Sequence, residues 1–192
     1  MKRIVLAQMT LLLAAPLAYS QATTWAFDTA HSGVDFTISH MALSKVHGHF
    51  GITSGTIVLD PADLAKSNVK AAIDVSSIDT ANSQRDTHLK SADFFDAATN
   101  PAANFVSTSV AKSGNGFTVA GNLTLHGVTK PVVLQVEGPT GPVTGPMDKK
   151  PHSGFSATTT IKRTDFGIGA NFPSAMVGDE VAITIDLETV QQ

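Results

Sequence analysis

The stretch GVDFTISH, residues 33–40, alternates apolar and polar side chains and indicates how this chain folds. Successive side chains of an extended backbone point to opposite faces, so Val34, Phe36 and Ile38 share one face with His40. Alternation with this period is typical of a half-buried antiparallel strand. The segment therefore predicts a β-strand whose apolar face lies toward the inside of the protein.

The same alternation recurs from Trp25 onward, and turn-forming residues bound each run. Gly55 and Gly121 interrupt two of the runs, where bulges or bends are expected. Together with residues 33–40, the runs predict roughly eight strands and an all-β fold. The further strands are expected at residues 46–59, 68–75, 105–110, 117–125, 132–136, 155–163 and 181–187.

Two segments depart from this alternation. Residues 81–91 lack β-branched clustering and follow Asp79 and Thr80, either of which can cap a helix, so a short helix is expected. Residues 138–146 contain repeated Gly-Pro pairs, and proline supplies no N–H for strand pairing. A long, stiff loop is therefore expected there.

Strand count leaves two architectures open. Eight antiparallel strands can close into a barrel, which removes exposed edges and leaves an interior wide enough for one slender ligand. A two-sheet sandwich fits a similar number of short alternating strands. The alternation alone does not distinguish the barrel from the sandwich.

The first residues have the composition of a secretory signal peptide, with a basic start, an apolar run over residues 4–13 and small residues after it. The apolar run is shorter than the roughly 20 residues that a membrane-spanning helix needs. We therefore expect cleavage after Ser20 or Ala22 and no transmembrane segment in the mature chain. Residues 1–22 are expected to be the signal peptide, and residues 23–192 a single exported domain.

Composition argues against several classes of function. The net charge is −3, and no long run of Lys or Arg provides the positive surface that nucleic-acid binding requires. The chain contains no cysteine, so disulfides and thiolate metal ligands are absent. It also lacks a Gly-x-Ser-x-Gly elbow and a His-Glu-x-x-His pair. We expect a protein that is not an enzyme and has no cofactor.

Several phrases in fixed order give the chain a resemblance to a known family. They are Asp28-Thr29-Ala30-His31-Ser32 with Phe36 and His40, Gly48-His49-Phe50 with Gly55, Arg85-Asp86-Thr87-His88-Leu89 with Asp93-Phe94-Phe95, the turn from Gly121 to Lys130, Arg163-Thr164-Asp165-Phe166-Gly167, and Val177-Gly178-Asp179. Over essentially the whole mature chain, the sequence resembles the YceI-like family of periplasmic, polyisoprenoid-binding proteins. The resemblance implies an elongated, eight-stranded, lipocalin-like antiparallel barrel with one short helix. It also implies an apolar interior that can enclose a polyisoprenoid, an isoprenoid quinone or another lipid.

The inward faces of the expected strands supply the lining of such an apolar tunnel. We expect it to consist of Val34, Phe36, Ile38, Phe50, Ile73, Phe105, Val119, Leu134, Phe155 and Ile183. The same faces also describe a filled core. The alternative hypothesis is therefore an envelope stress or interaction module without a bound lipid. Whether the chain forms a homodimer is left open by the sequence.

Four polar residues are candidates for the mouth of the tunnel: His31, His40, Arg85 and Arg163. An arginine there can hold a phosphate or pyrophosphate headgroup through paired hydrogen bonds, and a histidine can meet the headgroup or titrate. The opposing interpretation is that these residues form ion pairs and hydrogen bonds that close the barrel end. A third hypothesis is a weak enzyme that uses His31 or His40.

His47 and His49 lie two residues apart on one expected strand, a spacing that can place two imidazoles on one zinc ion. Their parity is opposite to that of the apolar residues Val46 and Phe50, so both rings are expected to point outward. No third ligand is evident, and no metal site is expected.

Overall fold

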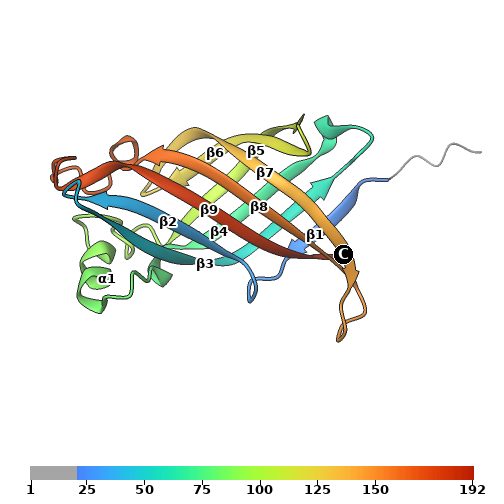
Figure 1. Ribbon diagram of the computed structural model, residues 1–192, viewed down its shortest axis with the longest axis horizontal. Coiled ribbons are helices and arrows are strands. Elements are labelled where there is room, and N and C mark those ends of the chain that lie inside the picture. The colour runs from blue at the N-terminus through green and yellow to red at the C-terminus, as the bar shows by residue number, and fades with distance from the viewer. Residues whose placement is uncertain (1–20) are drawn as a thin grey trace, which may run out of the picture.

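The computed structural model describes residues 21–192, which form a closed antiparallel sheet and one α-helix (Figure 1). Residues 1–20, which hold most of the expected signal peptide, lie outside the described part of the chain. Within the described part, no helix is long and apolar enough to cross a membrane. The strands are β1 (Thr23–Phe27), β2 (Gly33–His40), β3 (Ser44–Leu59), β4 (Asn68–Asp74), β5 (Ala102–Ser113), β6 (Gly116–Leu125), β7 (Val128–Thr144), β8 (Pro151–Lys162) and β9 (Val177–Gln191), and the helices are α1 (Ser83–Lys90) and the 3-10 turns η1 (Leu64–Lys66), η2 (Val75–Ser77) and η3 (Arg163–Phe166).

The sheet closes on itself because β3 pairs with both β2 and β4. The order around the wall is β3-β2-β9-β8-β7-β6-β5-β4. Strand β1 adds no further position, since it pairs with β3 and β9, the same two neighbours that flank β2. β1 and β2 thus follow one another in a single place of the wall, joined by residues 28–32. The predicted eight-stranded, elongated barrel is confirmed, and the closed ring excludes a sandwich.

Both expected glycine bends lie next to irregular pairing. The register of β3 against β4 shifts between Ile52 and Ser54, just before Gly55. At Gly55 the ring of Phe27 packs directly on the backbone, where an added Cβ would lie 2.1 Å from the ring. The register of β5 against β6 likewise shifts next to Gly121. These bulges let long strands follow the curved wall of the barrel.

The prediction of a loop over residues 138–146 was wrong, because β7 continues through Pro139 and Pro142 and pairs with β8 as far as Thr144. Beyond Val136, β7 has lost its other neighbour, β6, so it has a free edge. Two register shifts against β8 also lie in this stretch. Proline is tolerated at sheet edges and bulges, where its missing N–H breaks no ladder bond.

Helix α1 lies at one end of the barrel, outside the wall (Figure 1). Its N-cap is Asn82, whose side-chain oxygen accepts a hydrogen bond from the backbone N–H of Arg85 at 3.0 Å. The expected caps, Asp79 and Thr80, lie too early in the chain because Ala81 adopts a positive φ of 59° and turns the backbone before the helix begins. The helix itself was predicted correctly.

Buried apolar side chains form three clusters rather than one continuous core. One contains Phe94, Ile161, Phe166 and Ile168, another Trp25, Ile57 and Phe155, and the third Val75, Ala97 and Ala103. Other inward-pointing residues, such as Phe36 and Ile183, are only half-buried. A side chain that points inward yet stays accessible borders empty space, which locates the candidate site.

Candidate ligand-binding site

Two adjoining cavities occupy the inside of the barrel. The larger has a volume of about 370 Å³ and the smaller about 140 Å³. They share the lining residues Val34, Ile73, Leu123 and Ile183, which form a waist between them. The larger cavity falls within the size range of small-molecule sites, and the two cavities follow one another inside the barrel.

The residues that the strand alternation assigned to the lining do border the two cavities in the structure. Phe36, Ile38 and Phe50 border the larger cavity, and Phe105, Val119, Leu134 and Phe155 border the smaller one. Val34, Ile73 and Ile183 border both. All ten residues expected from the sequence thus face the interior of the barrel.

One end of the larger cavity is built from segments outside the strands, which the sequence reasoning did not assign to the lining. Leu89 comes from α1, Phe94 and Phe95 from the turn after it, and Phe172 and Met176 from the connection between η3 and β9. The rings of Phe94 and Phe172 stack with their centroids 4.8 Å apart. The motif Asp93-Phe94-Phe95 could have indicated this, because two adjacent phenylalanines outside a strand need an apolar surface to pack against.

The polar groups that border the larger cavity include basic side chains but no acidic one among the described residues. Its polar lining consists of Ser39, His40, Arg85, His88 and Arg163, and no carboxylate lies among the described lining residues. The smaller cavity adds only the hydroxyls of Ser67 and Thr159. The space is therefore apolar along its length and has cationic groups toward the α1 end, where His40 and Met176 are solvent-exposed.

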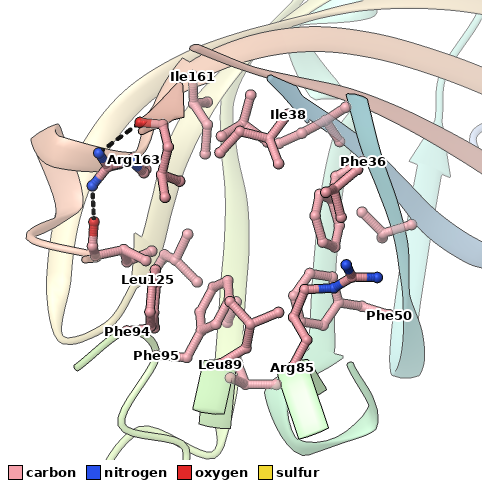
Figure 2. Close-up of a pocket in the computed structure, with 18 of the residues that line it drawn as sticks. Phe36, Ile38, Phe50, Arg85, Leu89, Phe94, Phe95, Leu125, Ile161 and Arg163 are labelled. Atoms are coloured by element: carbon pink, nitrogen blue, oxygen red, sulfur yellow. Dashed lines mark hydrogen bonds between the residues drawn. The ribbon is translucent and has the colours of Figure 1, made fainter. Parts of the chain in front are cut away.

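Arg85 projects from α1, and its guanidinium lies beside the rings of Phe36 and Phe50 (Figure 2). Its Nε donates to the hydroxyl of Thr80 at 2.7 Å and its Nη2 to the Thr80 carbonyl at 2.6 Å. The Thr80 hydroxyl in turn donates to the carboxylate of Asp86. Nη1 donates no hydrogen bond to any residue in 21–192, so this end of the guanidinium keeps donors for a ligand.

Arg163 has a different environment, which agrees with the interpretation that it closes the barrel end and not with a headgroup role. Its side chain is only 3% exposed, and two of its hydrogen bonds are drawn in Figure 2. The five N–H groups donate to five backbone carbonyls at 2.6–2.9 Å, those of Ile168, Gly169, Phe172, Val177 and Gly178. A guanidinium has five N–H donors, so none remains for a phosphate. Arg163 instead ties the connection between η3 and β9 to the barrel end.

The four histidines singled out in the sequence lie in three different places. His40 borders the larger cavity at its exposed end. His31 lies in the link between β1 and β2, borders neither cavity and bonds to Asp28, so its expected place at the mouth was wrong. His47 and His49 point outward, as expected, and bond to Thr37 and Asp35 respectively.

The polar groups of the described lining are few, and two of them are held by neighbouring side chains. In the described lining, His88 bonds to the surface residue Asp93 at 2.9 Å, and Arg85 is held by Thr80. What remains is a long apolar surface with one arginine that has free donors.

Comparison with known proteins agrees with this architecture. Residues 25–189 match the family model of the YceI-like domain. Protein YceI of Escherichia coli O17:K52:H18 is 40% identical over 162 residues, which make up 84% of this chain and 83% of the relative. The crystal structure of Burkholderia cenocepacia BcnA is similar with a TM-score of 0.70 and 29% identity, over 84% of this chain and 98% of that protein. A polyisoprenoid binding domain from Saccharophagus degradans shares the fold alone, with a TM-score of 0.61 at 17% identity over 90% of this chain and 100% of that domain.

Proposed function

This chain belongs to the YceI-like family, as its sequence phrases predicted, and on that premise we propose that it binds one long apolar molecule inside its barrel. The observation that carries the proposal is the pair of adjoining cavities, whose lining is almost entirely apolar except near α1. A polyisoprenoid, an isoprenoid quinone or another single-chain lipid has the matching shape. The description of the Saccharophagus degradans domain as polyisoprenoid binding supports this class of ligand.

Burial of the ligand supplies the main driving force. A chain that buries about 500 Å² of apolar surface gains on the order of 12 kcal/mol at ~25 cal/mol per Å². Lost translational and rotational freedom of the ligand offsets a large part of this gain. Binding of this kind requires no covalent chemistry, so in this proposal the protein acts as a binder rather than an enzyme.

The polar end of the ligand is placed beside Arg85. The apolar tail fills the smaller cavity and the waist, and the headgroup stays near α1, where the free Nη1 of Arg85 and the exposed ring of His40 lie. No carboxylate lies among the described lining residues, so an anionic or carbonyl-bearing headgroup would meet the guanidinium of Arg85 directly. The basic, apolar start of the sequence, residues 1–22, supports export to the periplasm as the place of binding.

Native mass spectrometry of the mature protein purified from its own periplasm tests the proposal. We expect one bound lipid per chain, which organic extraction then identifies. A mass equal to that of the bare polypeptide, together with failure to take up added lipid, would refute binding and favour the interaction module with no ligand.

A pair of variants on β9 tests the location of the ligand. Ile183→Trp places a large ring in the waist between the cavities and is expected to abolish full-length lipid occupancy. Thr184→Trp is the matched control, because the adjacent side chain points outward. Equal occupancy in both variants, with both folded, would show that the ligand lies elsewhere.

The headgroup assignment has its own test. Arg85→Met should weaken the binding of a prenyl phosphate at least tenfold while leaving the neutral prenol within about twofold, because one charge-assisted hydrogen bond is worth ~1.5–3 kcal/mol. Lys70→Met removes an outward charge of β4 and is the control. An equal loss of both ligands in the Arg85 variant would contradict the assignment.

A further inference from the structure

A cluster of ionisable side chains lies on the barrel away from both cavities. Asp28 and His31 belong to the link between β1 and β2, and Glu188 belongs to β9. One ligand atom from each of the three lies within 4.8 Å of the others. None of the three borders either cavity, so the proposed lipid site makes no use of them.

The backbone holds this cluster in place from both sides. The N–H of Asp28 donates to the carbonyl of Glu188 at 2.9 Å, and the N–H of Glu188 donates to the hydroxyl of Ser32 at 3.0 Å. The second carboxylate oxygen of Asp28 accepts from the N–H of Ala30, also at 3.0 Å. The link is therefore fixed against β9, and the three side chains converge without a long, flexible segment between them.

A second imidazole orients the glutamate. His152, near the start of β8, has its Nδ1 2.7 Å from a carboxylate oxygen of Glu188, and its Nε2 3.0 Å from a carboxylate oxygen of Asp148. Carboxylates that ligate a metal are themselves held by hydrogen bonds from outer residues, a role that His152 can fill for Glu188. The Asp148–His152–Glu188 chain thus extends the cluster to a third segment of the barrel.

The electrostatic environment attracts a cation. Three carboxylates, those of Asp28, Asp148 and Glu188, surround two imidazoles. These carboxylates favour positive charge at this spot.

We propose that Asp28, His31 and Glu188 form a binding site for one divalent transition-metal ion such as Zn²⁺, with His152 as the positioning residue for Glu188. Imidazole nitrogen and carboxylate oxygen are zinc ligands at about 2.0–2.2 Å, so tetrahedral ligand atoms lie roughly 3.3–3.6 Å apart. The 4.8 Å limit on the present separations requires only small side-chain movements. Three protein ligands leave room for water at the remaining position.

The location gives the ion a structural role. β1 and β2 occupy one place in the barrel wall, and the wall is interrupted where residues 28–32 connect them. A metal held by Asp28, His31 and Glu188 joins this interruption to β9. Metal binding to the folded state alone raises the apparent stability of the protein.

Isothermal titration of the tag-free mature protein with Zn²⁺, after removal of metals with a chelator, tests the site. We expect saturation at one ion per chain and a Zn²⁺-dependent rise in Tm. His31→Ala should weaken the affinity at least tenfold, and Glu188→Gln should do the same while preserving the shape of the side chain.

The matched control is His49→Ala. His49 is also exposed and also bonds to an aspartate, Asp35, at 2.9 Å, but it belongs to no cluster of three ligands among the described residues. This variant should retain wild-type affinity. Absence of saturable binding, retention of affinity in both site variants, or an equal loss in His49→Ala would overturn the proposal. Circular dichroism in the presence of chelator separates a lost site from a lost fold.

Discussion

Replacement of Arg163 by alanine tests whether this residue holds the barrel end together or serves a ligand. The guanidinium donates to five backbone carbonyls, three in the segment between η3 and β9 and two at the start of β9. Those of Ile168 and Gly169 belong to buried residues, whereas Phe172, Val177 and Gly178 are only partly buried. Water can replace the arginine at the partly buried carbonyls more readily than at the buried ones.

The size of the effect follows from the two buried carbonyls. A buried acceptor left without a partner costs ~1–3 kcal/mol, so Arg163→Ala should reduce the free energy of unfolding by about 2–6 kcal/mol. With an m-value of roughly 2 kcal/mol per M of urea, the unfolding midpoint should fall by about 1–3 M. Arg163→Lys should recover little, because an ammonium has only three donors and no planar fork.

Urea unfolding of delipidated protein, followed by circular dichroism, measures this change without any contribution from ligand binding. Lys162→Ala removes the exposed neighbouring cation and should change the free energy of unfolding by less than about 0.5 kcal/mol. If Arg163→Ala were as stable as Lys162→Ala but bound prenyl phosphate poorly, the reasoning would be refuted and Arg163 would be a headgroup residue.

Three further changes probe other parts of the barrel. The hydroxyl of Thr164 donates to Asp179 and lowers the pKa of this carboxyl below 3.8, so the carboxylate stabilises the fold above about pH 4 and loses that effect as pH falls through the lowered pKa. In urea unfolding, the stability difference between wild type and Asp179→Asn should therefore shrink on acidification. A difference that does not change with pH would count against this reasoning. Asn82→Ala removes the N-cap of α1 and should lower stability by ~0.5–2 kcal/mol, whereas an unchanged thermal midpoint would mean that the helix is held otherwise. Gly55→Ala forces a Cβ into the ring of Phe27 and should cost about 1–3 kcal/mol, measurable in the same titration; a neutral result would show that the ring can move aside.

The parity of the strands was predictable because it is a local property. Each strand that faces a core on one side must alternate apolar and polar residues, so residues such as Val34, Phe105 and Ile183 could be assigned to the interior before the barrel was known. The same locality explains the error over residues 138–146. Proline forbids a strand with two neighbours, but whether β7 has two neighbours at that point depends on where β6 ends.

The sequence by itself determined the all-β class, the number of strand positions, the helix at residues 81–91 to within two residues and the apolar inner face. Tertiary structure decided which hydrogen-bond partners each polar side chain finds. The sequence presents Arg85 and Arg163 as equivalent candidates, but the first keeps a free Nη1 beside the cavity and the second is saturated by carbonyls of a neighbouring segment. It also gives no sign that His31 meets Glu188, because contacts between residues far apart in the chain depend on strand order and register, which periodicity does not encode.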